Sequence, residues 1–427
     1  MSMRKVTFTI ILVSICFLGF AQHEKCATMH HLHRRISENP DLQNKMDESE
    51  IRTQQWIASQ PTVNPKLRMQ KRVQQIVTIP VVVHVLWNDP VENISDEQIF
   101  SQIEVLNEDF RLQNFDSLEF DHPFWEYSSD ALIEFCLASR DPNGDPTNGI
   151  TRTYTDVVSF LADGGEKYSA EGGVDGWDAT EYLNIWVCNL DATNGTLGYA
   201  TFPDELANYP EDDGVVIRYQ AFGYEGAVEA PNDGGRTATH EVGHWLNLRH
   251  IWGDEFCGND FVDDTEPAEQ DNYGCPEFPH NYFNSCGAGV NGEMYMNYMD
   301  YVDDDCMNMF TYGQTLRMEA ALFGERIGLL TSLGCADPTS VVNASFEKSI
   351  DLYPNPGNGV FTIKSNHFNH KMTNLSVYDA LGSKVQEYSN VSGASLTVDL
   401  TGLADGIYHI RIDGNDSSTV RKVVVSK

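Results

Sequence analysis

The middle of the chain alternates short apolar runs with polar segments. Residues 77–86 are apolar and mostly β-branched, a composition typical of a buried strand. Shorter runs at 133–137 and 183–188 predict two more strands, and residues 195–200 predict an edge strand. Residues 215–217 predict the last strand of this group. The pattern therefore predicts a β-sheet in this part of the chain.

Between and after these strands, apolar residues recur at helical spacing. Ser95 and the acidic residues after it can cap a helix. The apolar positions of this helix are Ile99, Ile103, Leu106 and Phe110. A final amphipathic helix is predicted from Gln314 to about Leu330. Strands interleaved with helices predict an α/β or α+β domain over residues 76–335.

The C-terminal region has a different pattern, with short strands separated by turn residues. A linker is expected at 336–344, and the region itself covers 345–427. The expected segments are 351–356, which precedes a turn at 357–359, and 375–379, 383–385, 395–400, 406–412 and 420–425. Closely spaced strands over such a length predict a small all-β sandwich.

The N-terminus is typical of a signal peptide. Arg4 and Lys5 precede an apolar run at 6–20, and small residues near Ala21 suit cleavage, which gives a signal peptide at 1–21. A membrane anchor is the alternative. The run is short for a span, and no second run of that length follows, so we expect secretion and no stable membrane span.

Residues 22–75 are polar and are interpreted as a propeptide with loose helices, broken near 37–40. Cys26 stands out in this segment, because a thiolate can occupy the open position of a catalytic zinc. The alternatives are an incidental thiol and a lipidated cysteine. A lipidated cysteine would directly follow the cleavage site, whereas Cys26 lies several residues beyond Ala21. We therefore favour a cysteine switch that keeps a zymogen latent.

Length and charge limit the classes of protein. The chain has 427 residues and a formal net charge of -35, enough length for two or three domains. Such acidity argues against nucleic acid or an anionic membrane as a partner, because both are polyanions. Acidic loops of a secreted protein could instead bind calcium.

The strongest chemical signal is a histidine motif. His240 and His244 are four residues apart, which places both imidazoles on one face of a helix, with Glu241 beside them. This pattern is typical of a zinc site with its own general base. His250 can be a third ligand if the chain turns, and Asn247 tolerates the left-handed backbone of such a turn. A chance match is the alternative, and the third histidine argues against it.

After His250 the chain becomes irregular and acidic. Four cysteines in this segment suggest disulfides in an exported protein: Cys257, Cys275, Cys286 and Cys306. They allow three pairings, and a second zinc site is disfavoured because no CxxC spacing occurs. Cys136 and Cys188 lie on predicted strands as buried thiols or a third bridge, and Cys335 is expected to be the odd one.

Residues 295–301 carry two more candidates. Met299 could be an ordinary core residue, but after a third zinc histidine it is expected in the Met-turn beneath the metal. Tyr301 would then lie near the zinc, where its phenol could donate to a developing oxyanion.

These motifs resemble the pappalysin family of metzincin metalloproteases, especially its ulilysin- and mirolysin-like members. The resemblance covers about residues 76–333 and rests on 240–246, His250, 297–301 and the cysteine segment. It implies an α+β metzincin fold, with a twisted mixed sheet, an active-site helix and an irregular C-terminal subdomain. It also implies one catalytic zinc on His240, His244 and His250, with Glu241 as general base, Met299 beneath the metal and Tyr301 as transition-state stabiliser.

The same resemblance implies details that spacing does not give. It implies disulfides Cys257–Cys286 and Cys275–Cys306, and structural calcium near residues 260–265. It places Asp304 in a pocket that selects a basic residue just after the scissile bond, although residues 303–305 could equally form a solvated turn or a calcium ligand set. The departure from the family pattern is Asn247 in place of glycine, which should preserve activity.

The tail resembles the sorting domain of type IX secretion. The match rests on residues 352–356, 377–379, 403–408 and 422–425 and covers about 345–427. It implies type IX secretion machinery as a partner, passage through the periplasm, and an extracellular or cell-surface location.

The sequence therefore predicts a secreted zinc endopeptidase that is made as a zymogen and cleaves protein or peptide substrates before Arg or Lys. Such specificity would let the protein activate itself at Arg68, Lys71 or Arg72. A catalytically silent surface adhesin on a metal-stabilised scaffold is the rival. It is disfavoured because a structural site needs neither Glu241 nor Tyr301.

Overall fold

The computed structural model describes residues 25–60, 76–191, 193, 195–336, 350–365, 374–379, 384–389, 395–413 and 418–427. The chain divides into two compact units, Met1–Ala336 and Asp337–Lys427. The expected signal peptide, nearly all of the expected linker and the activation residues Arg68, Lys71 and Arg72 lie outside the described residues. Within the described part, no helix combines the length and apolarity that a membrane span requires.

The first unit contains one mixed sheet of order β2-β1-β4-β6-β5, with β3 also paired to β1. Its strands are β1 (Val77–Trp87), β2 (Ile133–Leu137), β3 (Ile150–Tyr154), β4 (Leu183–Cys188), β5 (Gly198–Ala200) and β6 (Val215–Arg218). All pairs are parallel except β5 with β6. The sequence predicted β5 as an edge strand, and the structure shows that it is antiparallel. The sequence missed β3, which has three polar residues in a row and is partly exposed.

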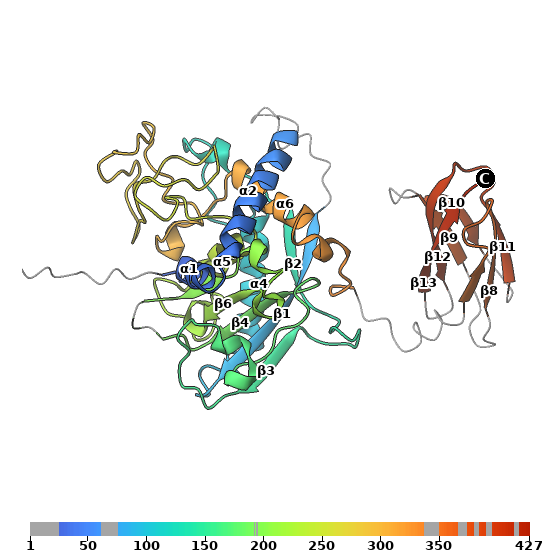
Figure 1. The fold of residues 1–427 in the computed structure, drawn as a ribbon, viewed down its shortest axis with the longest axis horizontal. Helices are drawn as coiled ribbons and strands as arrows, with labels where there is room; N and C mark the ends of the chain where they lie inside the picture. Colours follow the sequence, from blue (N-terminus) through green and yellow to red (C-terminus); the bar gives the residue numbers. More distant parts are fainter. Residues whose placement is uncertain are drawn as a thin grey trace, which may run out of the picture. The chain divides into compact units, whose positions relative to one another are not determined.

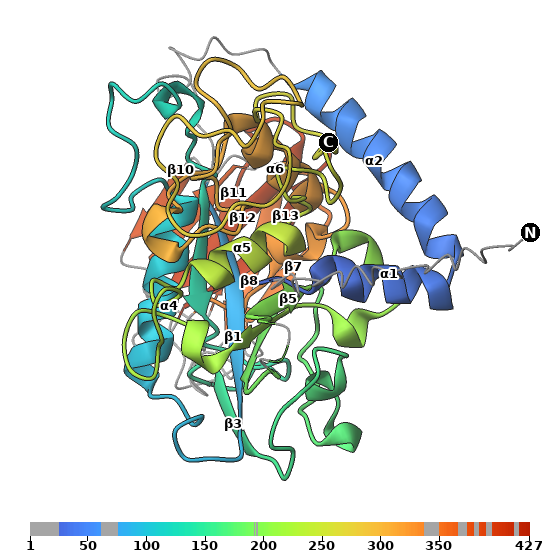
Figure 2. The same ribbon diagram turned by 90° about the vertical axis from the view of Figure 1, so that its left-hand side faces the viewer.

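Two helices cover one face of this sheet (Figure 2). Helix α4 (Asp96–Phe110) begins at Ser95, whose hydroxyl accepts a hydrogen bond from the backbone N–H of Gln98, as the sequence predicted. Helix α5 (Arg236–Trp245) packs beside it above β5 and β6. Helix α6 (Tyr312–Phe323) ends at Gly324, and a 3-10 turn at 327–331 replaces the rest of the predicted helix.

The N-terminal segment forms two helices, α1 (Thr28–Glu38) and α2 (Asp41–Ser59), joined at Pro40 (Figure 1). Helix α1 lies at the edge strand β5, and α2 lies along α6. Short 3-10 helices among the described residues are η2 (Trp125–Tyr127), η3 (Gly165–Lys167), η4 (Ser169–Glu171), η6 (Pro203–Glu205), η7 (Pro210–Asp212), η8 (Tyr219–Ala221), η9 (Asp304–Cys306) and η10 (Ile327–Thr331).

The long segment between α5 and α6 is irregular apart from η9 and is cross-linked by disulfides Cys257–Cys286 and Cys275–Cys306. A third bridge joins Cys136 to Cys335, so the expectation that Cys335 is the odd cysteine was wrong. The C-terminal end of the first unit lies next to the end of β2, where the Ser139 N–H donates to the Gly334 carbonyl at 2.8 Å. This contact brings Cys335 close to Cys136. Cys188 is a buried free thiol.

The second unit is the all-β sandwich that the sequence predicted. Its sheets have the orders β10-β9-β12-β13 and β11-β8-β7, and every pair is antiparallel. The strands are β7 (Ile350–Tyr353), β8 (Val360–Ser365), β9 (Asn374–Tyr378), β10 (Lys384–Ser389), β11 (Ser395–Asp399), β12 (Gly406–Asp413) and β13 (Ser418–Val425). Inward-facing residues of both sheets form one apolar core.

Candidate active site

Helix α5 and the turn after it bring three histidines together. His240 and His244 lie one turn apart on the same face, and the helix ends at Trp245. Asn247 then adopts a left-handed backbone with φ 74°, as the sequence predicted for this turn. The turn swings His250 back, so that its ring lies 5.1 Å from His240 and 4.5 Å from His244 between centroids.

The imidazoles converge through their Nε2 atoms, which lie 3.1 to 3.2 Å apart in all three pairs. Zinc–nitrogen bonds of about 2.0 Å at a tetrahedral angle require a separation of about 3.3 Å, so the spacing fits zinc. Each opposite nitrogen has its own partner: the Tyr298 carbonyl for His240, the Leu248 carbonyl for His244 and the Asp254 carboxylate for His250. Burial lowers the pKa of His240 and His244 well below the usual range. Both rings are therefore neutral, and each can donate a nitrogen lone pair to a metal ion.

Cys26 completes this group. Its Sγ and one nitrogen from each of the three histidines lie within 4.8 Å of one another and are all buried. In the described part of the chain, this is the one group of three or more His, Cys, Asp or Glu that could hold a metal ion. Burial, followed by the charge of Glu241, raises the pKa of the Cys26 thiol, so a bound cation would be needed to hold a thiolate here.

Glu241 lies beside the cysteine rather than among the imidazoles. Its Oε2 accepts hydrogen bonds from the Thr28 hydroxyl at 2.9 Å and from the Cys26 thiol at 3.4 Å. Its Oε1 is buried and has no hydrogen-bond partner among the residues that the structure describes. Burial raises the pKa of Glu241 to about 8. Both of these hydrogen bonds come from the N-terminal segment. When that segment leaves, the carboxyl group of Glu241 becomes available to bind another group.

Met299 and Tyr301 lie where the motif placed them. Met299 is fully buried under α5, and a Cβ at Gly243 would come within 2.5 Å of its sulfur, so this contact requires glycine. The Tyr301 ring lies 5.6 Å from His240 and 4.9 Å from His250 between centroids, and its hydroxyl donates to the Cys26 carbonyl at 3.4 Å. Tyr301 therefore borders both the three imidazoles and the N-terminal segment.

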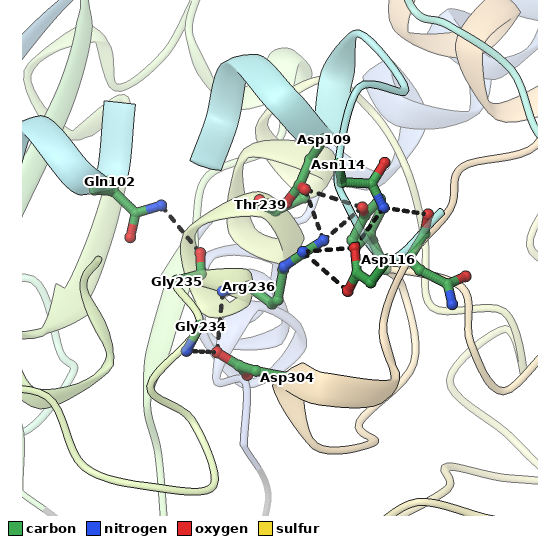
Figure 3. Close-up of polar contacts among 11 residues, drawn as sticks. Gln102, Asp109, Asn114, Asp116, Gly234, Gly235, Arg236, Thr239 and Asp304 are labelled. Atoms are coloured by element: carbon green, nitrogen blue, oxygen red, sulfur yellow. Dashed lines mark hydrogen bonds and ion pairs between the residues drawn. The ribbon is translucent and has the colours of Figure 1, made fainter. Parts of the chain in front are cut away.

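Asp304 lines a pocket next to the histidines, together with Lys25, Cys26 and Tyr301. Its Oδ2 accepts hydrogen bonds from the backbone N–H groups of Gly234 at 2.9 Å and Arg236 at 3.1 Å (Figure 3). Burial raises the pKa of Asp304 to about 6. The carboxylate is thus fixed at the start of α5 rather than exposed in a solvated turn.

The neighbouring Asp303 binds the lysine of the N-terminal segment. Lys25 Nζ lies 3.3 Å from Asp303 Oδ1, 3.0 Å from Asn232 Oδ1 and 3.2 Å from the Val302 carbonyl. A cationic side chain therefore already occupies the rim of the pocket that Asp304 lines.

Arg236 anchors the start of α5 through a buried network that sequence reasoning missed (Figure 3). Its guanidinium donates to Asp109 at 2.6 Å, to Asp116 at 3.1 Å and to the Tyr298 hydroxyl at 2.6 Å. Thr239 donates to the other oxygen of Asp109 at 2.6 Å. The network ties α4, α5 and the Met-turn together. Nothing in the spacing of Asp109 on its helix distinguishes it from a surface acid.

The acidic loop expected to bind calcium uses its carboxylates internally. Asp260 accepts from the Thr265 hydroxyl at 2.8 Å and from the Val262 N–H at 3.1 Å. Asp264 accepts from the Gly313 N–H at 2.9 Å. These contacts stabilise the loop against α6, and they leave calcium binding as a prediction.

Comparisons with known proteins agree with this fold and site. Residues 168–323 match the family model described as pregnancy-associated plasma protein-A, and residues 351–426 match the secretion system C-terminal sorting domain. Extracellular metalloprotease 1 of Coccidioides posadasii is 33% identical over 260 residues, which cover 58% of this chain and 78% of that protein. An extracellular metalloprotease of Arthroderma otae is 32% identical over 260 residues, which cover 59% and 80%.

Solved structures show the same relationship. Mirolysin in complex with a compound superposes with a TM-score of 0.58 at 50% identity, covering 60% of this chain and 97% of that one. Promirolysin of Tannerella forsythia superposes with a TM-score of 0.63 at 44% identity, covering 72% and 97%. Fold and site thus define a zinc metalloendopeptidase of the metzincin type. The chain belongs to the pregnancy-associated plasma protein-A, or pappalysin, family.

The protein is accordingly a secreted or cell-surface protease made as a zymogen, with a type IX sorting domain as its second unit. The rival interpretation as a catalytically silent adhesin is set aside.

Proposed function

We propose that this chain is a latent endopeptidase in which Glu241 is the general base, Cys26 maintains latency, and Asp304 selects Arg or Lys just after the scissile bond. The observation that carries the proposal is the buried group of Cys26 with His240, His244 and His250. Three imidazoles and one thiol match a catalytic zinc site whose fourth position is closed.

His240, His244 and His250 would hold the zinc. When bound, zinc supplies a Lewis acid that polarises the scissile carbonyl and makes water a better nucleophile near neutral pH. Glu241 accepts the proton of the attacking water and passes it to the leaving amine. The Tyr301 hydroxyl turns from the Cys26 carbonyl to the oxyanion and donates to it. Met299 supports the site from below.

Latency follows from the contacts of residues 25–28. Cys26 forms an isolated parallel β-bridge with Gly198 of β5, and the Ala27 N–H donates to the Gly198 carbonyl at 3.0 Å. Thr28 and Cys26 together occupy Glu241 Oε2. The segment therefore blocks the metal position, the base and the edge strand at once.

The proposed specificity is supported by the resident Lys25. Its ammonium lies against Asp303 at the pocket lined by Asp304. In a free pocket, an arginine side chain could meet the carboxylates with two hydrogen bonds. Cleavage before Arg68, Lys71 or Arg72, near the end of the propeptide at 22–75, would then free the catalytic domain, 76–335, from the piece that carries Cys26. Structural calcium at residues 260–265 remains part of this proposal.

The deciding experiment is Glu241→Ala in the full chain. The variant should bind zinc with unchanged stoichiometry while its peptidase activity after activation falls by several orders of magnitude, because the proton transfer is lost. Zinc content is measured by mass spectrometry and turnover with a quenched peptide. A Glu241→Ala enzyme with near-normal turnover would rule out this mechanism.

A further inference from the structure

A second acidic site lies under helix α1, away from the histidines. Asp212, at the end of η7, is fully buried, and its carboxylate forms an ion pair with Arg35 of the N-terminal segment. The Arg35 guanidinium also lies 4.3 Å from the centre of the Tyr209 ring. Within the described part of the chain, the Asp212 carboxylate has no hydrogen bond besides this ion pair.

Glu205 adds a second carboxylate to the same site. Its Oε1 accepts from the Phe202 N–H at 2.9 Å. Its Oε2 is buried, has no hydrogen bond within the described ranges of the chain, and faces His31 at 3.8 Å. Burial raises the pKa of Glu205 to about 7. This oxygen therefore has spare capacity for a donor.

The catalytic unit itself contributes one cation here. Lys167 is buried, donates to the Asp212 carbonyl at 2.6 Å and lies over the Tyr199 ring. Glu166 is bonded by the Tyr199 hydroxyl. Lys167 thus lies among the carboxyl groups of Glu166, Glu205 and Asp213, and Asp213 already pairs with Arg326. Arg35 adds a second cation, paired with Asp212, only while the N-terminal segment is bound.

Removal of that segment leaves a preformed acidic pocket with an aromatic wall. A buried carboxylate without a cation is costly, so this pocket favours a basic occupant. Arginine fits best, because its flat guanidinium can pair with Asp212 and stack on Tyr209 as Arg35 does.

The location of this pocket follows from the course of the N-terminal segment. Lys25 lies on the Asp304 side, Cys26 lies at the imidazoles, and α1 continues on the other side. Thr28 bonds Glu241, and Arg35 is seven residues further along α1, which is about 10 Å at 1.5 Å per residue. An extended peptide covers that distance in three or four residues.

We infer that Asp212, with Glu205 and Tyr209, forms a substrate subsite for a basic side chain three or four residues before the scissile bond. The inference rests on the proposed function, because it takes the Asp304 pocket as the position after that bond. The competing explanation is that Asp212 serves only to hold the zymogen together.

The test uses full-length protein activated by limited proteolysis, with loss of residues 25–60 checked by mass spectrometry. The peptides keep Arg after the scissile bond and carry either Arg or its neutral isostere citrulline at the third or fourth position before it. Wild type should prefer Arg at one of these positions by roughly five- to tenfold in kcat/KM. Asp212→Asn should reduce that preference to less than about twofold.

The matched control is Glu211→Gln, which removes the same charge from an exposed neighbour and should keep the full preference. Wild type indifferent to Arg at both positions would overturn the inference. So would a preference that survives Asp212→Asn, even if that variant activates faster. Cleavage of the parent peptide and the Arg preference after the scissile bond are measured in the same series, so failure of the proposed function is recognised separately.

Discussion

The two units bury very different kinds of side chain. Among the described residues, the second unit buries only apolar groups and three neutral polar ones, Ser365, Ser376 and Thr419. The first unit buries acids and bases throughout, including Lys167, Arg236, Glu241, Arg317 and Arg326. Burial of ionisable groups costs free energy unless each is paired, so a fold retains them where they act or position other groups.

The buried charged groups of the first unit fall into two sets, according to whether their partners lie in the catalytic unit or in the N-terminal segment. Arg326 meets Asp213 through two hydrogen bonds of 2.9 Å, and Trp245 donates to the same carboxylate at 2.8 Å. This set is complete within the catalytic unit and braces the end of α5. Arg317 instead pairs with Glu50 of α2, and Glu241 is bonded by Thr28 and Cys26. Groups whose partners belong to the N-terminal segment are those that activation would expose.

The largest expected effect tests whether the two units divide the work. Deletion of residues 345–427 should leave zinc content and peptidase activity intact, because the catalytic unit has its own core. Delivery to the cell surface should fall at least a hundredfold, with the protein kept in the periplasm. Fractionation and immunoblotting of the native host measure this. The reciprocal control is full-length Glu241→Ala, which should be delivered normally. Normal surface delivery of the deleted form would contradict the assignment of catalysis to the first unit and delivery to the second.

Much of this architecture could be predicted because the relevant signals are local. The alternation of apolar residues gave the sheet and the helix capped by Ser95, and the spacing of His240, His244 and His250 gave the metal group. Asn247 could be placed because few residues accept a left-handed backbone. Each of these inferences needs only the residues within a few positions.

The missed disulfide and the missed ion pairs depend on contacts between distant residues. Cys335 pairs with Cys136 across 199 residues, and no local pattern encodes that return of the chain to β2. Asp109 binds Arg236 from 127 positions away, and Asp212 binds Arg35 from the N-terminal segment. In the sequence these carboxylates are indistinguishable from the many surface acids of an acidic chain. Their roles follow only from burial.

The next effect concerns the residues that the N-terminal segment contributes to the active site. Cys26→Ala should shorten the half-time of activation at least tenfold, because the metal position is no longer blocked and Glu241 loses one donor. Appearance of the mature band on a gel measures this half-time. Cys188→Ala is the matched control, because Cys188 is the other buried free thiol of the described chain and lies on β4 of the central sheet. This variant should activate at the wild-type rate. Equal time courses for wild type and Cys26→Ala would leave Cys26 as an incidental thiol.

The smallest effect tests whether Asp304 acts through its charge. Its pKa lies at about 6, above the usual range for aspartate, because the carboxyl is buried. It is therefore charged above pH 6 and neutral below, and departure of Lys25 with the N-terminal segment would move this midpoint upward. The preference for Arg over Leu after the scissile bond should be roughly tenfold at pH 8 and shrink to about twofold by pH 5. Because both peptides share the catalytic groups, their kcat/KM ratio cancels the pH dependence of the chemistry.

Two variants sharpen this test of Asp304. Asp304→Asn should give the low ratio at every pH, because the amide still fills the site but carries no charge. Asp305→Asn removes the same charge from an exposed neighbour and should keep both the preference and its pH dependence. A ratio in wild type that is flat between pH 5 and pH 8 would show that the Arg preference does not depend on a group titrating there. Loss of the preference in Asp305→Asn would instead assign it to the summed surface charge of residues 303–305, and Asp304 would then be only a brace for the start of α5.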